Sequence, residues 1–312
     1  METTLDVRII EPRLKHPTIF ETFDATPQGK AFSIINDHDP KPLYYQLMAE
    51  RPNTFFWEYI KNGPQEWVVK IHKLNPDNNE PSIGSIAAGD YRKALVFKRF
   101  GLDFCCGGKQ TLEVAAKAKG LDKELILKEL NQIDNKVSDS FQDYAKWDIS
   151  ELVDHIVHRH HGYIREITPD IKAILNKVVK VHSDTHPELK ELLEKFLLLD
   201  QDLTNHMYKE ENVLFPYIKA LAQPANIDGI ENPVVHSAIR AMEEEHDIAG
   251  EYLADIQMLT NGYTVPEDAC GSYRMLYGLL NEYDDDLQLH IHLENNILFP
   301  KAIKLESQYL KK

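Results

Sequence analysis

The sequence predicts a mainly α-helical protein that ends in an antiparallel four-helix bundle, preceded by a small helical domain and a small two-layer α/β domain. After about residue 147, four long stretches show the apolar spacing of helices. The first 74 residues instead alternate short strand-like and helix-like segments, and a polar, proline-bounded linker follows them. We therefore expect domains at residues 1–76, 82–140 and 147–312.

The first domain is expected to have the element order β-α-β-α-β-β. The last two strands form a hairpin, because Asn62-Gly63 supplies residues that accept positive φ in a tight turn. The polar loop 36–42 is expected to be a turn in which aspartate side chains bond backbone amides, with binding of a ligand or metal as the alternative. The six segments are, in order, residues 5–10, 17–23, 31–35, 42–50, 55–60 and 66–71.

The middle domain, from Ser82 to about Val137, is predicted to be helical, with Gly120 as a stop between two helices. Cys105 and Cys106 precede two glycines and a helix. A thiolate there could be stabilised by the helix N-terminus and be reactive, and buried, inert cysteines are the alternative. The third cysteine, Cys270, is expected to pack in the interior.

The four bundle helices have recognisable start signals. Ser150 can cap the first helix, and each later helix has a proline where its first turn is expected. These prolines are Pro187, Pro233 and Pro266.

Composition limits the partners and the compartment. The formal charge of −15 disfavours nucleic acid and anionic membranes, which attract Lys and Arg. The N-terminus lacks the pattern of a leader, and no stretch is apolar enough to span a bilayer. Three cysteines, two of them adjacent, suit a reducing compartment. We expect a soluble, cytoplasmic protein.

The sharpest signal is an internal repeat. The segments 206–216 and 290–300 share six of eleven positions, and each begins with His-x-x-x-Glu and ends with Leu-Phe-Pro. Because residues four apart lie on the same helix face, His206 and Glu210, and likewise His290 and Glu294, can converge on one metal centre. The two copies fall on the second and fourth bundle helices.

A complete site needs ligands from the first and third helices as well. His246 supplies one on the third helix, and the first helix offers a histidine cluster. In a helical hairpin, two ligands must lie about equally far from the connecting turn. That condition admits both His161 and His158 as partners of His206, whereas His182 would lie roughly 30 Å along the helix from His161.

Four imidazoles and two carboxylates, without a thiolate, suit Fe or Mn better than a structural Zn site. We expect Glu210 and Glu294 to bridge two metal ions, each of which is also held by two histidines. The rival pattern of paired Glu-x-x-His motifs occurs only once, at Glu243 and His246. Asp202 and Glu245 are candidates to orient a ligand or relay protons, with solvated surface carboxylates as the alternative.

At these residues the chain resembles the RIC (Repair of Iron Centers) family of di-iron proteins, which have a short cysteine domain and a hemerythrin-like domain. The resemblance selects His161 from the histidine cluster. Residues 1 to about 74 resemble a separate domain family of unknown function. The matching motifs are Gly101–Gly108 (GLDFCCGG), Asp154–His161 (DHIVHRHH), His206-x-x-x-Glu210, Glu245-His246-Asp247 and His290-x-x-x-Glu294-Asn295.

The resemblance implies a hemerythrin-like bundle holding two non-haem iron ions as an oxo-bridged centre. The metal ligands would be His161, His206, Glu210, His246, His290 and Glu294. The protein would repair iron–sulfur clusters damaged by nitric oxide or peroxide, by donating iron or intercepting nitric oxide. Its partners would be damaged iron–sulfur proteins, and the domain with Cys105 and Cys106 would mediate homodimerisation or transfer to them.

Two other functions fit the same site. One is a hemerythrin-like sensor that binds oxygen or nitric oxide reversibly without losing iron. The other is an enzyme that reduces nitric oxide to nitrous oxide, which gas analysis after a single turnover would reveal. The sequence does not decide whether the protein is an enzyme.

Overall fold

The computed structural model describes residues 3–51, 54–61, 63, 65–73, 80–105, 107–134, 143–223 and 235–309. The chain divides into two compact units, residues 1–82 with 109–111, and residues 83–108 with 112–312. Within the described ranges, no helix is long and apolar enough to cross a membrane.

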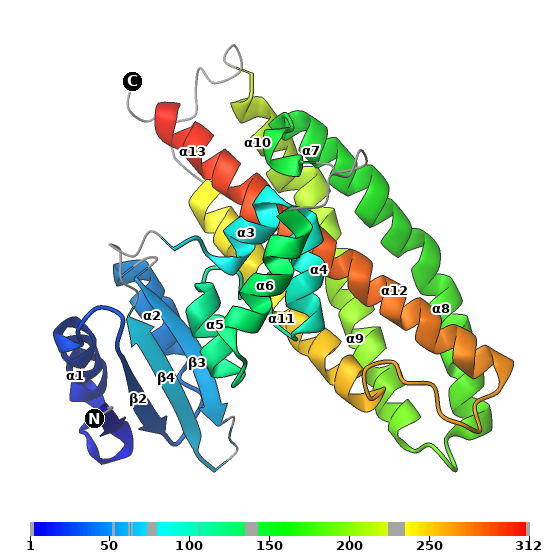
Figure 1. Ribbon diagram of the computed structural model, residues 1–312, viewed down its shortest axis with the longest axis horizontal. Coiled ribbons are helices and arrows are strands. Elements are labelled where there is room, and N and C mark those ends of the chain that lie inside the picture. Colours follow the sequence, from blue (N-terminus) through cyan, green and yellow to red (C-terminus); the bar gives the residue numbers. More distant parts are fainter. Residues whose placement is uncertain are drawn as a thin grey trace. The chain divides into compact units, whose positions relative to one another are not determined.

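A four-stranded sheet and two helices form the first unit (Figure 1). The strand order is β1-β2-β4-β3, in which β1 is parallel to β2 and β4 is antiparallel to both neighbours. The predicted β-α-β-α-β-β two-layer domain is confirmed. Its elements are β1 (Thr3–Asp6), α1 (Pro12–Ala25), β2 (Ala31–Asn36), α2 (Lys41–Glu50), β3 (Phe55–Lys61) and β4 (Trp67–Lys73).

Both helices of this unit cover the same face of the sheet. Strands β2 and β3 are each antiparallel to β4, so the two crossover connections run in the same direction across the sheet. Right-handed crossovers then place α1 and α2 on one side. Alternate residues of the central strands are buried there with residues of both helices. This core contains Ile19, Phe23, Phe32, Ile34, Leu43, Leu47, Val69 and Ile71.

The first strand is shorter than expected, and the predicted hairpin turn is described only in part. The strand expected at 5–10 ends at Asp6, because the Asp6 carboxylate accepts the backbone N–H of Arg8 at 3.1 Å and starts a 3-10 turn, η1 (Val7–Ile9). In the hairpin, Gly63 has a φ of +45°, as its turn position requires, and Asn62 lies outside the described residues.

Short helices form the middle region, as predicted. Gly120, with a φ of +65°, separates α5 from α6. Its N–H donates to the Lys117 carbonyl, and the next N–H, of Leu121, donates to the Ala116 carbonyl. These are the two bonds of a Schellman motif, which glycine closes without strain. The helices are α3 (Ile83–Gly89), α4 (Tyr91–Arg99), α5 (Leu112–Ala118) and α6 (Lys123–Asp134).

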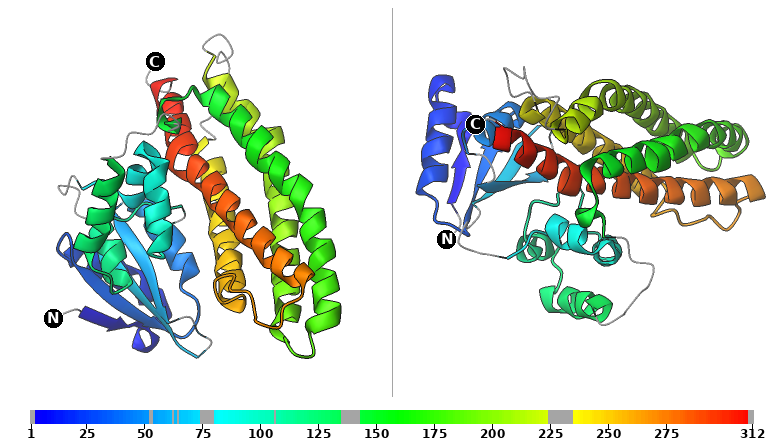
Figure 2. Two further views of the ribbon diagram at one scale, coloured as in Figure 1. Left: turned by 45° about the vertical axis from the view of Figure 1, so that its right-hand side comes forward. Right: turned by 90° about the horizontal axis from the view of Figure 1, so that it is seen from above.

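The four-helix bundle follows, with its long helices side by side (Figures 1 and 2). Three of its four helices contain a π-helical segment between two α-helical parts, and α11 forms the third helix. The elements are α7 (Ile149–His155), η3 (Ile156–His161), α8 (Gly162–His182), α9 (Glu188–Lys209), η4 (Glu210–Leu214), α10 (Phe215–Leu221), α11 (Val235–Leu259), α12 (Gly271–Leu293), η6 (Glu294–Leu298) and α13 (Phe299–Tyr309).

The expected helix starts are only partly right. α9 begins at Glu188, directly after Pro187. The fourth helix begins at Gly271 rather than at Pro266, because the intervening residues form a turn. Pro233 lies outside the described residues.

Asp148 caps the first bundle helix, so the expectation for Ser150 is wrong. The Asp148 carboxylate accepts the Ser150 N–H at 2.8 Å, and the Glu151 side chain accepts the Asp148 N–H, which completes a capping box. We expect Asp148→Ala to lower the free energy of unfolding by about 1 kcal/mol in urea titrations. Asp170→Ala, which removes an exposed mid-helix carboxylate, should leave it nearly unchanged; equal losses would contradict the cap.

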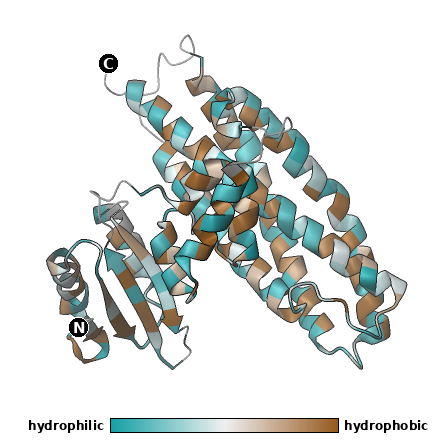
Figure 3. Cartoon of the chain, in the orientation of Figure 1, coloured by the Kyte–Doolittle hydropathy of each residue, from teal (hydrophilic) through white to brown (hydrophobic). Residues whose placement is uncertain are grey.

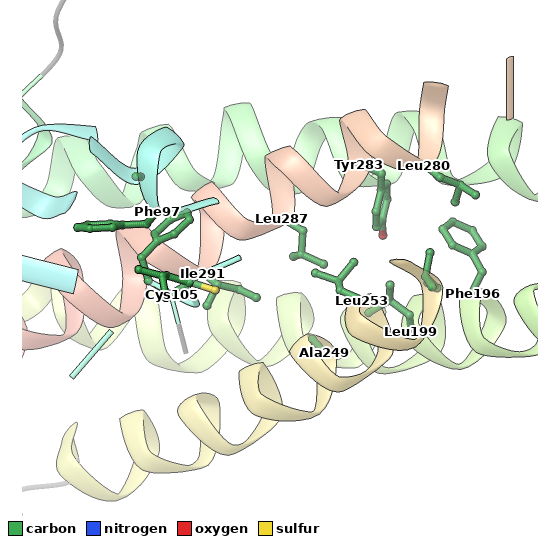
Figure 4. Packing of buried hydrophobic residues seen from close by; sticks show 14 of the residues in the cluster. Phe97, Cys105, Phe196, Leu199, Ala249, Leu253, Leu280, Tyr283, Leu287 and Ile291 are labelled. Atoms are coloured by element: carbon green, nitrogen blue, oxygen red, sulfur yellow. The ribbon is translucent and has the colours of Figure 1, made fainter. Parts of the chain in front are cut away.

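Two apolar clusters fill the bundle, whose helices carry hydrophobic and hydrophilic residues along their whole length (Figure 3). One cluster joins the distal half of the bundle to the middle region, where Phe97 and Cys105 lie beside Ile291 (Figure 4). The other packs the α7, α10 and α13 end and includes Phe215 and Phe299. Buried polar residues lie between the two clusters, and water is therefore excluded from their surroundings.

Candidate metal centre

All six predicted metal ligands lie together in the bundle. Each helix contributes, and every one of the six is at most 2% exposed. They form two groups of four residues whose ligand atoms lie within 4.8 Å of one another. One group contains His161 and His290, the other contains His206 and His246, and both contain Glu210 and Glu294.

Each carboxylate contacts one histidine of each group. Glu210 Oε2 lies 3.3 Å from the Nε2 atoms of both His161 and His206. Glu294 Oε1 lies 3.0 Å from His290 Nε2, and its Oε2 lies 3.1 Å from His246 Nε2. Two shared carboxylates between two pairs of imidazoles are the arrangement that the sequence predicted for bridging ligands.

Three of the four histidines have their outer nitrogen hydrogen-bonded to an oxygen acceptor. His161 Nδ1 donates to Glu211 Oε1 at 2.7 Å, and His206 Nδ1 donates to Glu245 Oε2 at 2.9 Å. His246 Nδ1 donates to the amide oxygen of Asn295 at 2.9 Å. These acceptors hold the proton on Nδ1, so that each Nε2 presents a lone pair to the centre of the bundle.

The inward atoms fit metal ions better than hydrogen bonds among themselves. His206 and His246 face each other with Nε2 atoms 2.9 Å apart, and the Nε2 atoms of His161 and His290 are 3.1 Å apart. Where both nitrogens present lone pairs, this approach is repulsive unless a cation accepts them. Both oxygens of Glu210 are buried without a hydrogen-bond donor among the described residues. Such groups are costly unless a cation compensates them.

The π-helical segments begin or end at ligands. Glu210 starts η4 and Glu294 starts η6, whereas His161 ends η3. Pro216 and Pro300 follow η4 and η6 closely. A proline ring clashes with the carbonyl four residues earlier in an α-helix, and the wider π turn relieves that clash. The Leu-Phe-Pro motif therefore shapes the backbone that presents each glutamate.

Electrostatics couples the histidines to their carboxylates. Burial lowers the pKa of His206, but the negative charges of Glu210, Glu245 and Glu294 outweigh it and raise the pKa to about 10 in the metal-free chain. The hydrogen bond from His206 lowers the pKa of Glu245 to about 2. A proton on His206 thus supplies part of the positive charge that these carboxylates require.

The structure distinguishes among the other candidate residues. Glu245, one of the two candidates to orient a ligand, contacts His206, whereas the other, Asp202, is exposed and interacts with Tyr252 on α11. Sequence reasoning missed Glu211 and Asn295. Both directly follow a glutamate of the internal repeat, and that shared position is the signal that could have found them.

The remaining histidines of the first helix lie outside the group of six. His158 is exposed, which leaves His161 as the residue that faces the centre. His160 is buried, and its ring stacks on that of His290 with centroids 5.6 Å apart and planes 8° from parallel. His182, at the far end of α8, lies with Nε2 3.2 Å from Cys270 Sγ.

The cysteines have different surroundings. Cys105 is buried, and its thiol donates to Asp103 Oδ1 at 3.2 Å, which matches the buried alternative for this residue. Cys106 lies outside the described residues. Cys270 is exposed, so the expectation that it packs in the interior is wrong; it ends the connection between α11 and α12 and directly precedes the first residue of α12.

Gly108, in the loop that follows the cysteines, lies close to neighbouring backbone and side-chain atoms. A Cβ added to Gly108 would lie 2.5 Å from the Phe104 carbonyl oxygen and 2.8 Å from Asn296 Oδ1. Asn296 in turn donates to the Phe104 carbonyl at 3.2 Å. The cysteine loop is thereby attached to η6, two residues after Glu294.

In the first unit, the polar loop 36–42 forms the expected turn. Asp39 Oδ1 accepts the backbone N–H of Lys41 at 3.0 Å and the hydroxyl of Tyr59 at 2.7 Å. These two bonds occupy Asp39 within its own unit.

Comparisons with known proteins agree with this geometry. Residues 152–302 match the family described as hemerythrin HHE cation binding domain. Residues 79–134 match a domain of unknown function, DUF542, and residues 4–73 match the uncharacterized conserved protein family DUF2249. Together with the two buried ligand groups, these matches indicate a metal-binding bundle that follows two further family regions in the sequence.

Curated relatives cover the middle region and the bundle. The iron-sulfur cluster repair protein YtfE of Citrobacter koseri is 39% identical over 221 residues, which is 71% of this chain and 96% of that protein. The proteins of the same name from Escherichia coli and Shigella boydii are each 38% identical over the same shares.

Proposed function

Since this chain belongs to the family of iron–sulfur cluster repair proteins, we propose that it restores iron–sulfur clusters damaged by nitrosative or oxidative stress, by donating iron, intercepting nitric oxide, or both. The observation that carries this proposal is the pair of buried His/Glu groups that share Glu210 and Glu294. Nitrogen and oxygen ligands without a thiolate suit iron that is held and then given up.

The proposed cofactor is two non-haem iron ions in an oxo-bridged centre. His161 and His290 would hold one ion and His206 and His246 the other, with Glu210 and Glu294 serving both. Held by these residues, a ferrous pair would supply open coordination positions for a diatomic ligand and the iron to be donated.

The protein's own residues prepare this site. Glu211, Glu245 and Asn295 keep the histidine protons on the outer nitrogens. The apolar clusters on both sides exclude water, which strengthens the attraction between the carboxylates and the cations. The two carboxylate oxygens of Glu210 accept no hydrogen bond from the described residues, so they are available to the ions.

The proposal extends to organisation and partners. We assign three domains, at residues 1–76, 82–140 and 147–312, and expect the protein to act in the cytoplasm. The domain with Cys105 and Cys106 would mediate homodimerisation or transfer of iron to these clients. Its attachment to η6 through Asn296 supports a link between that domain and the metal centre.

Reactivation of a damaged dehydratase tests the repair role. A dehydratase whose cluster has been destroyed by nitric oxide should regain activity with the iron-loaded protein. The dehydratase should not regain activity with the Glu210→Ala, Glu294→Ala double variant, which lacks both shared carboxylates. Free iron at the same concentration is the control, and equal recovery with the protein and its double variant refutes the role.

A further inference from the structure

The two halves of the metal centre are built alike but are not supported alike. The His-x-x-x-Glu repeat relates α9 to α12, and the histidines that complete the site, His161 and His246, each follow a residue that contacts the repeat histidine of a neighbouring helix. In one half that residue is Glu245, which accepts from His206 Nδ1 at 2.9 Å. In the other half it is His160, which stacks on His290.

His290 therefore lacks the support that its counterpart has. Its Nδ1 is buried and has no hydrogen-bond partner among the residues that the structure describes. His160 cannot replace the carboxylate, because its own Nδ1 faces Asp286 Oδ2 at 3.1 Å and its ring lies parallel to that of His290. A hydrogen-bond acceptor at Nδ1 raises the basicity of a histidine ligand and fixes its orientation. Of the four histidine ligands, His290 therefore has the least support from such a bond.

The other histidine of that half, His161, shares its acceptor. Glu211 Oε1 receives both His161 Nδ1 and Arg165 Nη2, each at 2.7 Å. On the opposite side, Glu245 uses Oε2 for His206 and Oε1 for Lys209. A carboxylate oxygen that accepts from two donors, one of them cationic, forms a weaker hydrogen bond with the imidazole N–H than an oxygen that accepts from the imidazole alone.

We propose that the two metal positions differ in lability, and that the ion held by His161 and His290 is the one released first. This inference rests on the proposed function, in which the chain gives up iron. The ion held by His206 and His246 stays longer, because an undivided carboxylate oxygen and the Asn295 amide oxygen support its two histidines.

Chelator competition measures the release. The full chain is loaded anaerobically with ferrous iron, mixed with excess ferrozine at fixed pH, and followed by absorbance. We expect two phases of one ion each. Glu245→Ala removes the acceptor of His206 and should speed the slow phase by about tenfold, so that the two phases approach each other. Acceleration of the fast phase instead assigns the labile ion to the other position and overturns the proposal.

A second variant tests the gain of support. His160→Gln places an amide oxygen at the position that corresponds to Glu245 and keeps a donor for Asp286. It should slow the fast phase by about tenfold and leave the slow phase unchanged. His158→Gln, the same substitution at an exposed position two residues away, should change neither phase.

The outcomes separate this inference from the function on which it rests. A chain that binds two ions and releases them at one common rate overturns the inference and leaves the repair proposal intact. A chain that binds no pair of ions overturns both.

Discussion

Glu294→Ala is expected to abolish tight binding of both metal ions rather than of one. Glu294 belongs to both ligand groups, with Oε1 3.0 Å from His290 Nε2 and Oε2 3.1 Å from His246 Nε2. Its loss removes a ligand from each position and one of the two carboxylates that the ligand groups share. Affinity should fall by more than the roughly 10–100-fold that loss of an outer partner costs. Equilibrium dialysis with metal analysis measures this directly.

Glu306→Ala is the matched control, because it also removes a carboxylate of the bundle that is only 2% exposed. Glu306 accepts from the Tyr217 hydroxyl at 2.8 Å and from the Val235 N–H at 3.2 Å, and it is not part of either ligand group. This variant should lose stability yet still bind two ions. Retention of two tightly bound ions by Glu294→Ala would contradict the bridging role.

The repeat made the metal centre predictable from sequence. A histidine and a glutamate four residues apart must share a helix face, and two copies on separate helices limit how those faces can meet. His206, Glu210, His290 and Glu294 are brought together for this reason. The order of strands and helices in the first unit was equally accessible, since alternation and helical spacing are local properties of the chain.

The surroundings of the ligands were harder to predict, because they depend on contacts between helices. Hairpin length admits both His158 and His161, and only the packing of η3 against α12 decides that His161 faces inward and His158 faces solvent. Asp202 lies one helical turn before His206, but on α9 it is Leu203 that is buried in the core, whereas Asp202 is exposed. Glu211 supports a histidine 50 residues away, a pairing that no local pattern specifies.

The π turns have a local cause that sequence reasoning did not use. A proline six residues after each repeat glutamate disfavours regular α-helix just before it. The resulting wide turn lets consecutive residues act together: Glu210 faces the ligand groups, while Glu211 reaches His161 from outside. The start of the first bundle helix also has a local cause. Asp148 and Ser150 are both good N-cap residues, and the capping box between Asp148 and Glu151 decides in favour of Asp148.

The stability gained from metal should grow as the pH rises. In the metal-free chain the pKa of His206 is about 10, above its ordinary value of 6.5, and the pKa of His161 is also raised, since its carboxylate neighbours outweigh burial. The folded state therefore binds these protons more tightly than the unfolded state. The stabilisation from the His206 proton is complete below pH 6.5 and is lost as the pH approaches 10.

Metal removes this dependence, because a metal ligand must give up its proton and the ion then supplies the positive charge. Each proton contributes up to about 1.4 kcal/mol per pH unit, or roughly 3 °C in the midpoint of a domain of this size. Calorimetry at pH 7, 8 and 9 should show the metal-free midpoint falling while the loaded midpoint stays nearly level. The unfolding midpoint of the metal-free His206→Gln variant should fall less steeply with pH than that of the metal-free protein. If the midpoints of the loaded and the metal-free protein declined in parallel, the role assigned to these protons would be wrong.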